Sequence, residues 1–146
     1  MTSTPGDNPP RAPGQLPMWI EGDMLVMQID GPVEVREMRM VIELSEGLYN
    51  RNGYTLVLGD ARLTKGLTPD ARKLHAERIK DVLRPSHTAI HNVSSVGRMM
   101  TTLAQRGIEL VSGKTYPVSF HKDEAEARAE LARQRAILRA SAGRRG

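Results

Sequence analysis

Short apolar runs alternate with longer stretches of apolar residues at helical spacing from Met18 onward. The runs at 18–20 and 24–29 are separated by Glu21-Gly22-Asp23, which predicts two strands joined by a tight turn. Further apolar runs predict strands at 54–58, 88–93 and 117–120. The segment 108–111 fits either a short strand or an extended connection, and the pattern leaves both open.

Amphipathic helices are expected between these strands, at 35–49, 69–83, 95–107 and 123–140. The second helix has the clearest start, with a hydroxyl cap at Thr68, a proline at the first helical position and an acid at Asp70. Because strands alternate with helices and the first two strands form a hairpin, we predict an α/β fold. It is a single domain with a mixed sheet of four or five strands and about four helices.

The two ends of the chain differ in composition from the middle. Five of the nine prolines lie within residues 1–17, which hold few apolar side chains. Such a segment cannot offset its ordering entropy, so residues 1–17 are predicted to be a disordered arm. Residues 18–138 are predicted to form the domain, and the Arg- and Gly-rich residues 139–146 a flexible basic tail.

Composition also limits the classes of function. The chain has no cysteine, which excludes disulfides, iron–sulfur clusters and thiolate zinc sites and fits a reducing cytoplasm. Its longest uninterrupted apolar run is Met24 to Met27, so no membrane insertion is expected. The net charge is only +4 and aromatic residues make up 3% of the chain, so no specific nucleic-acid binding is expected either.

Few residues suggest chemistry by themselves. His87 and His91 are expected on one strand, where a spacing of four residues separates them by roughly 13 Å, so no metal site is predicted. Asp60 follows a predicted central strand, where open α/β sheets place ligands, but a turn-capping aspartate is the alternative. His75 is expected to be a packing residue. No set of groups converges on a reacting atom, so we expect neither an enzyme nor a cofactor.

The order of the predicted elements is similar to that of the STAS and SpoIIAA-like superfamily of small bacterial proteins. Three features carry the resemblance: the strand end Leu58-Gly59-Asp60, the helix start Thr68-Pro69-Asp70-Ala71-Arg72, and Ala127 with Leu131 in the last helix. In anti-sigma-factor antagonists of this superfamily, a partner kinase phosphorylates a serine at the start of the helix after the central strand, in the pattern Asp-Ser-Ser-Gly. Here Leu67-Thr68-Pro69-Asp70 stands in that place, so Thr68 is the candidate phosphoacceptor.

The resemblance implies a non-enzymatic regulatory module that binds a protein partner. We expect the partner to bind loop 60–68 and the helix that follows, at Asp60, Thr64, Thr68 and Arg72. Basic residues crowd this region, which fits either a face for an acidic partner or an ordinary solvated helix surface. The alternative is a carrier of a small apolar or lipid-like ligand, held between sheet and helices and lined by methionines. A homodimer stays open.

Overall fold

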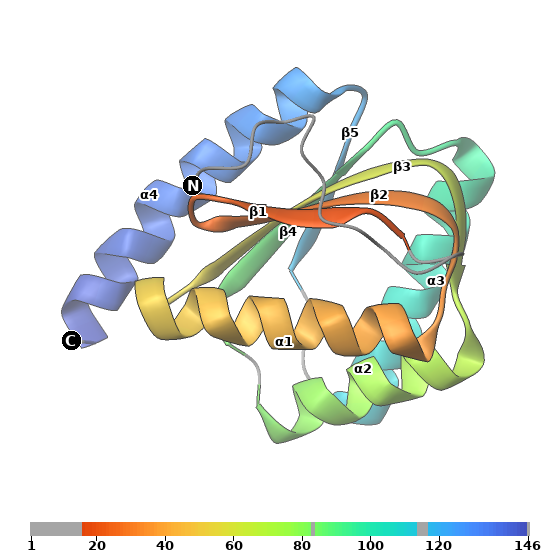
Figure 1. The fold of residues 1–146 in the computed structure, drawn as a ribbon, viewed down its shortest axis with the longest axis horizontal. Helices are drawn as coiled ribbons and strands as arrows, with labels where there is room; N and C mark the ends of the chain where they lie inside the picture. The colour runs from red at the N-terminus through yellow and green to blue at the C-terminus, as the bar shows by residue number, and fades with distance from the viewer. Residues whose placement is uncertain (1–15, 83, 114–116, 146) are drawn as a thin grey trace.

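The structure, a computed structural model, describes residues 16–82, 84–113 and 117–145. Five strands form one sheet in the order β1-β2-β3-β4-β5 (Figure 1). They are β1 (Met18–Glu21), β2 (Met24–Val33), β3 (Thr55–Leu67), β4 (Ser86–His91) and β5 (Val118–His121). β1 is antiparallel to β2 and the other neighbours are parallel, so the predicted mixed α/β sheet is confirmed.

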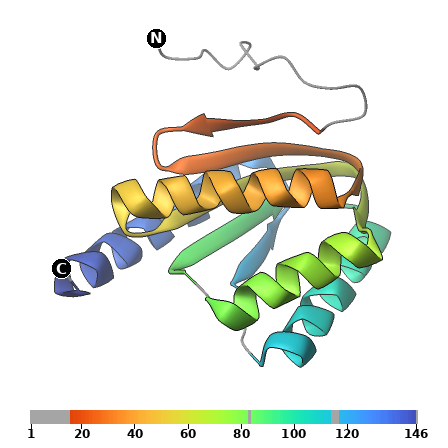
Figure 2. The same cartoon turned by 60° about the horizontal axis from the view of Figure 1, so that its bottom comes forward.

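Helices cover both faces of the sheet (Figure 2). They are α1 (Val35–Asn52), α2 (Pro69–Asp81), α3 (Ser95–Ser112) and α4 (Glu124–Arg145). Leu56 and Leu58 of β3 pack with Leu131 of α4, whereas Val57 between them packs with Leu48 of α1. Because side chains alternate along a strand, α4 covers one face and α1, α2 and α3 cover the other. None of the helices in the described ranges is long and apolar enough to cross a membrane.

β3 is longer than the sequence predicts, and the predicted loop 60–68 is wrong. The strand continues to Leu67 because β2 also extends beside it, and Gly31 pairs with Thr64 and Val33 with Leu67. Register shifts interrupt this part of the ladder, and Gly31 has a left-handed φ of 103°. These irregularities break the period-2 pattern by which a strand is recognised in a sequence.

α3 also continues past its predicted end. Residues 108–111 are helical, neither a strand nor an extended connection, because Gly107 lies inside the helix rather than at its stop. The actual stop is Gly113, which has a φ of 71° and donates its N–H to the Glu109 carbonyl. Gly107 instead lies beside α2, where a Cβ built on it would be 3.6 Å from Cδ of Arg72.

Replacing Gly107→Ala should therefore stabilise the protein. The added methyl group meets only ordinary van der Waals contact, and alanine is favoured over glycine inside a helix by about 0.5–1 kcal/mol. Urea unfolding should show that increase. Gly113→Ala is the matched control and should lower the free energy of unfolding by about 1 kcal/mol, because its backbone is left-handed. A loss at both positions would contradict this account of α3.

At both ends of the chain, the ordered domain extends further than the sequence predicts. Residues 1–15 of the predicted arm lie outside the described residues, but Leu16 is buried and the Pro17 carbonyl accepts from the Gln28 N–H at 3.0 Å. The predicted tail begins at residue 139, yet α4 runs to Arg145. Arg139 donates from Nε to the Tyr54 hydroxyl at 3.0 Å, which holds that turn of α4 to the start of β3.

A partly buried carboxylate joins the β1–β2 turn to α4. Asp23 accepts two hydrogen bonds from Arg135, at 2.6 and 2.8 Å, and one from the Tyr54 hydroxyl at 2.7 Å. Burial alone would raise the pKa of Asp23, but the hydrogen bonds from Arg135 and Tyr54 hold that pKa below its usual value. Asp23 therefore stabilises the fold in its charged form.

Stability should consequently fall in acid through this group. A carboxyl with a depressed pKa in the folded state contributes stability that is complete above its unfolded pKa of about 4 and is lost as the pH falls through the folded pKa. Unfolding of the wild type and of Asp23→Asn should be compared between neutral pH and pH values below about 4. We expect the difference between the two proteins to shrink in acid, and a constant difference would argue against this linkage.

Candidate partner-binding surface

The start of α2 is built by Thr68 much as the sequence predicts. Its hydroxyl accepts from the Ala71 N–H at 3.3 Å, and its own N–H donates to the Val33 carbonyl at 3.0 Å. Pro69 occupies the first turn and Ala71 is fully buried. This anchoring leaves the next residue, Arg72, exposed on α2, with its Cδ beside Gly107 of α3.

Thr68→Ala should lower the free energy of unfolding by about 1 kcal/mol, because it removes the acceptor that satisfies an otherwise unpaired N–H at the helix start. Thr68→Ser keeps that acceptor and is the control. Chemical denaturation of both variants measures the difference. Equal stability of the two variants would show that the hydroxyl does not cap α2.

Asp60 lies on the opposite face of the sheet from α2. It pairs with Gln28 and His91 and follows the alternation of Leu58, which packs with α4. Asn92, whose φ of 59° is left-handed, donates from Nδ2 to Asp60 Oδ1 at 3.5 Å. The expectation that Asp60 follows the end of its strand is wrong, since β3 continues and only its pairing with β4 ends there.

The four predicted binding residues therefore do not form a single site in the structure. Thr68 and Arg72 lie together at the start of α2, whereas Asp60 faces the side of α4. The backbone of Thr64 pairs with Gly31 in the extended part of β3, and its side chain lies outside the described part of the chain.

An exposed apolar stripe on α3 is the feature that the sequence did not reveal. Met99, Leu103 and Leu110 are 58%, 61% and 86% exposed. Successive helical residues turn by about 100°, so these three side chains fall within about 40° of one another. Gly97 is buried and Gln105 lines an interior cavity, and both lie on the far side of the helix. The apolar stripe thus occupies the middle of the solvent-facing side.

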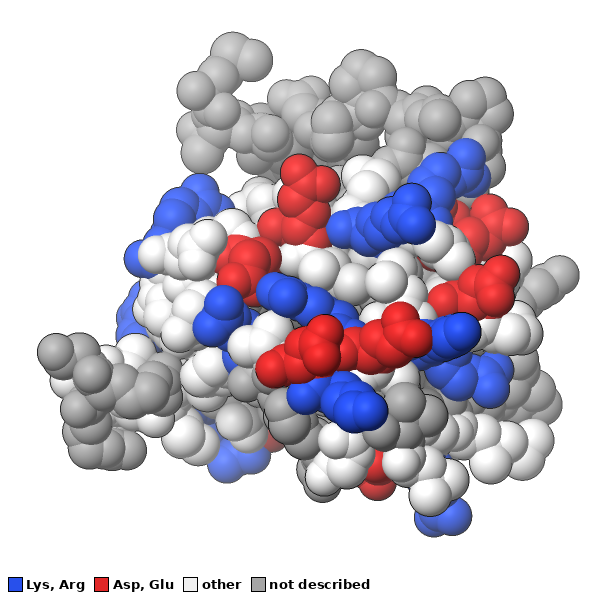
Figure 3. Space-filling view, turned by 90° about the horizontal axis from the view of Figure 1, so that it is seen from below, with Lys and Arg blue, Asp and Glu red and all other residues white. Residues whose placement is uncertain are grey.

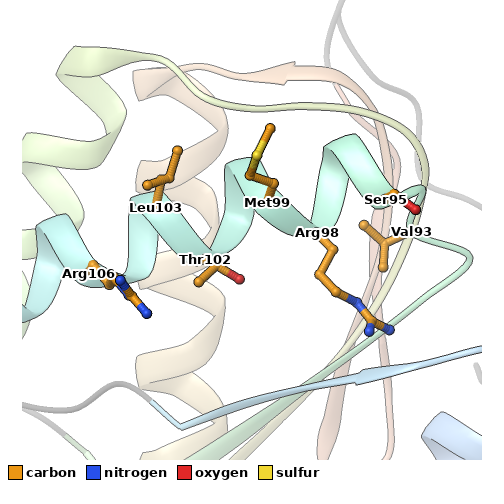
Figure 4. A pocket seen from close by; sticks show the side chains of 7 residues that line it. All are labelled: Val93, Ser95, Arg98, Met99, Thr102, Leu103 and Arg106. Atoms are coloured by element: carbon orange, nitrogen blue, oxygen red, sulfur yellow. The ribbon is translucent and has the colours of Figure 1, made fainter.

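Arginines border the apolar stripe. An open hollow of about 640 Å³ runs along α3, lined by Val93, Ser95, Arg98, Met99, Thr102, Leu103 and Arg106. Met99 and Leu103 point to the same side of the helix in Figure 4, and Arg98 and Arg106 extend along its other flank. The Arg98 guanidinium lies 5.4 Å from the centre of the Phe120 ring, which fixes the direction of that charge.

The neighbouring surface over α1 and α2 has a mixed charge. Figure 3 shows acidic and basic side chains interspersed there, as the exposed sequence Asp70, Arg72, Lys73 and Glu77 of α2 also indicates. Interspersed signs produce no strong field of one sign, which is the feature that nucleic-acid binding surfaces need.

An interior cavity lies between the sheet and α1, α2 and α3. Its volume is about 120 Å³, and its walls are mostly apolar, with His75, Thr88 and Gln105 as polar members. Burial lowers the pKa of His75 to about 4, so the ring is neutral at pH 7. Ligand pockets usually measure about 300 Å³ or more. This cavity is too small for the lipid-like ligand of the carrier hypothesis, which we do not carry further.

His87 and His91 both lie on β4, as predicted, and their side chains face the same side of the sheet. Among the residues that the structure describes, no group of three or more His, Cys, Asp or Glu side chains could hold a metal ion.

No known family model matches this sequence, and no curated protein matches it. Among solved structures, the chain is similar to the anti-sigma factor antagonist SpoIIAA in its unphosphorylated form, with a TM-score of 0.49 and 11% identity over 81% of this chain and 97% of that one. It is also similar to an uncharacterized DUF3478-family protein with a SpoIIAA-like fold from Shewanella loihica PV-4, with a TM-score of 0.47 and 18% identity over 80% of this chain and 91% of that one. The likeness is one of fold.

Proposed function

We propose that this domain is a non-enzymatic, cytoplasmic protein-interaction module whose partner binds the apolar stripe of α3 and the adjoining start of α2. One observation carries the proposal: Met99, Leu103 and Leu110 stand on the solvent side of α3, opposite its buried side. Several exposed large apolar side chains on one side of a helix are typical of a surface that a partner covers.

The bordering charges indicate the chemistry of the partner. Arg72, Arg98 and Arg106 are exposed beside the stripe, so a complementary surface offers apolar side chains next to carboxylates. Covering one large apolar side chain contributes roughly 1.5–3 kcal/mol. Three such side chains supply enough free energy for a specific contact, and the arginines then select an acidic partner.

This surface revises the one expected from the sequence. Arg72 remains part of it, because its side chain lies beside Gly107 of α3. Asp60 is left out, since it lies on the α4 side of the sheet.

Phosphorylation of Thr68 stays a prediction. A phosphate there would meet the positive end of the α2 dipole, so the fold should tolerate it while the surface beside Arg72 changes. Thr68→Asp, which keeps a capping acceptor and adds charge, should be as stable as the wild type but lose partner binding. Thr68→Ala should still bind. If both variants bind like the wild type, Thr68 serves only as a cap.

Site-specific photocross-linking tests the proposed surface. A photoreactive phenylalanine analogue replaces Leu103 in one protein and Ile137 in a control, because Ile137 is an apolar α4 side chain that is also 50% exposed. In cells of the native host, position 103 should give a defined protein adduct that position 137 does not. An adduct with a second copy of the chain would identify a homodimer. Identical adducts at both positions would contradict the proposal.

A further inference from the structure

A row of polar side chains crosses the face of the sheet that α4 covers. His87 Nε2 of β4 lies 2.9 Å from Ser119 Oγ of β5, and Ser119 Oγ lies 2.8 Å from His121 Nε2. His121 Nδ1 lies 3.4 Å from Oε1 of Glu126, in the first turn of α4. The hydroxyl is thus held between two imidazoles, and the second imidazole contacts a carboxylate.

The carboxylate determines the direction of these hydrogen bonds. Glu126 accepts only, so the proton of a neutral His121 belongs on Nδ1 and leaves Nε2 as an acceptor. Ser119 has one proton and donates it to His121 Nε2. The Ser119 oxygen must then accept from His87 Nε2–H. A hydroxyl that donates to one imidazole, whose other nitrogen faces a carboxylate, is the arrangement of an activated nucleophile.

These groups are partly shielded from water but within reach of it. His87 is 9% exposed and the His121 side chain is 11% exposed, whereas Ser119 is half-buried. The Glu126 side chain is 47% exposed, and Lys122 lies 4.0 Å from its other oxygen, Oε2. β5 is the last strand of the sheet, and among the described strands it pairs with β4 alone. Because Ser119 keeps part of its surface in contact with solvent, a small molecule can reach it.

We propose that Ser119 is a reactive serine that takes up the acyl group of small activated esters, with His121 as its general base and Glu126 as the residue that positions His121. The Ser119 oxygen forms a bond to the acyl carbon while the bond from that carbon to the leaving oxygen breaks. The hydroxyl proton moves to His121 Nε2, and the leaving group departs as its anion or takes that proton. The product is a serine ester, with no oxidant or metal required.

His87 supports the attacking oxygen from the other side. Burial lowers the pKa of His87, with His121 and Arg133 adding to the effect and Glu130 opposing it, so its ring is neutral at pH 7. A neutral imidazole that donates from Nε2 orients the Ser119 oxygen and leaves the second lone pair of that oxygen for attack. This inference is independent of the α3 surface, so either can fail alone.

Acetylation by p-nitrophenyl acetate tests the proposal on the full chain. Peptide mass spectrometry follows the acetyl group on Ser119 and on Ser95, an exposed serine in the same molecule that serves as the internal reference. Ser119 should be acetylated about a hundredfold faster than Ser95, the gain expected from general-base catalysis. Equal rates at the two serines, or no ester on Ser119, would overturn the proposal.

Variants separate general-base assistance of this single acylation, which has no turnover, from a merely structural hydrogen bond. His121→Gln should reduce acetylation of Ser119 to the rate of Ser95. Glu126→Gln should slow it severalfold, and Glu126→Asp should restore most of the rate, because only a carboxylate holds the proton on Nδ1. Thermal unfolding of each variant checks that the fold is retained. A Ser119 rate that does not change in folded His121→Gln or Glu126→Gln would also overturn the assignment.

Discussion

Asp23→Ala should lower the free energy of unfolding by about 2 kcal/mol, within the range found when a shielded polar group loses its hydrogen-bond partner. The carboxylate is the shared acceptor of Arg135 and Tyr54, and Tyr54 is only 3% exposed. Without Asp23, a guanidinium and a hydroxyl lose their acceptor in a partly buried site, so part of the cost of removing them from water is no longer offset. Urea unfolding at neutral pH measures the loss.

The Glu130–Arg133 pair on α4 is the matched control for Asp23. Arg133 is 63% exposed, and exposed ion pairs contribute at most about 1 kcal/mol. Arg133→Ala should therefore change the stability far less than Asp23→Ala. If the two variants lose equal amounts, the β1–β2 turn is not fastened to α4 through Asp23.

Local signals in the sequence were sufficient for most of the fold. The cap at Thr68 and the proline after it specify the start of α2 without any distant contact. Gly22, with a φ of 60°, closes the β1–β2 hairpin between two apolar runs. Such features depend on neighbouring residues alone, and propensity rules describe them well.

Features that depend on distant pairing could not be predicted in the same way. β3 extends beyond Asp60 only because β2 lies beside it, and the register shifts there hide the strand pattern. The His87–Ser119–His121 row likewise forms across two strands that are 32 residues apart at His87 and Ser119. No sequence motif in β4 or β5 indicates that the two strands pair. The order of the strands in the folded sheet is what brings these side chains together.

The α3 surface was hidden for a different reason. Met99 and Leu103 are spaced like core residues, and apolar residues occur on both sides of this helix. The spacing of apolar residues indicates that a helix has an apolar side. Where two sides are apolar, the spacing does not determine which of them packs on the sheet. Leu110 lies beyond Gly107, where the sequence had suggested that the helix ends. A stripe of three residues was therefore divided between a helix and a connection.

The second large effect concerns partner affinity. Leu103 lies between Met99 and Leu110 along the helix, and it is 61% exposed. Central residues of an interface contribute most of the binding free energy. Truncating one of them weakens binding by roughly 2 kcal/mol or more. Leu103→Asp adds a charge that would lie unpaired in the apolar contact. We expect the Kd to rise about a hundredfold, while the exposed position leaves the folding stability unchanged.

The most direct measurement compares two Kd values for the partner captured at position 103. Isothermal titration gives the affinity of that partner for Leu103→Asp and for Ile137→Asp, which places the same charge on a similarly exposed apolar residue of α4. The α3 surface predicts a loss of about a hundredfold for Leu103→Asp and wild-type affinity for Ile137→Asp. Wild-type affinity for Leu103→Asp, or an equal loss for both variants, would contradict it.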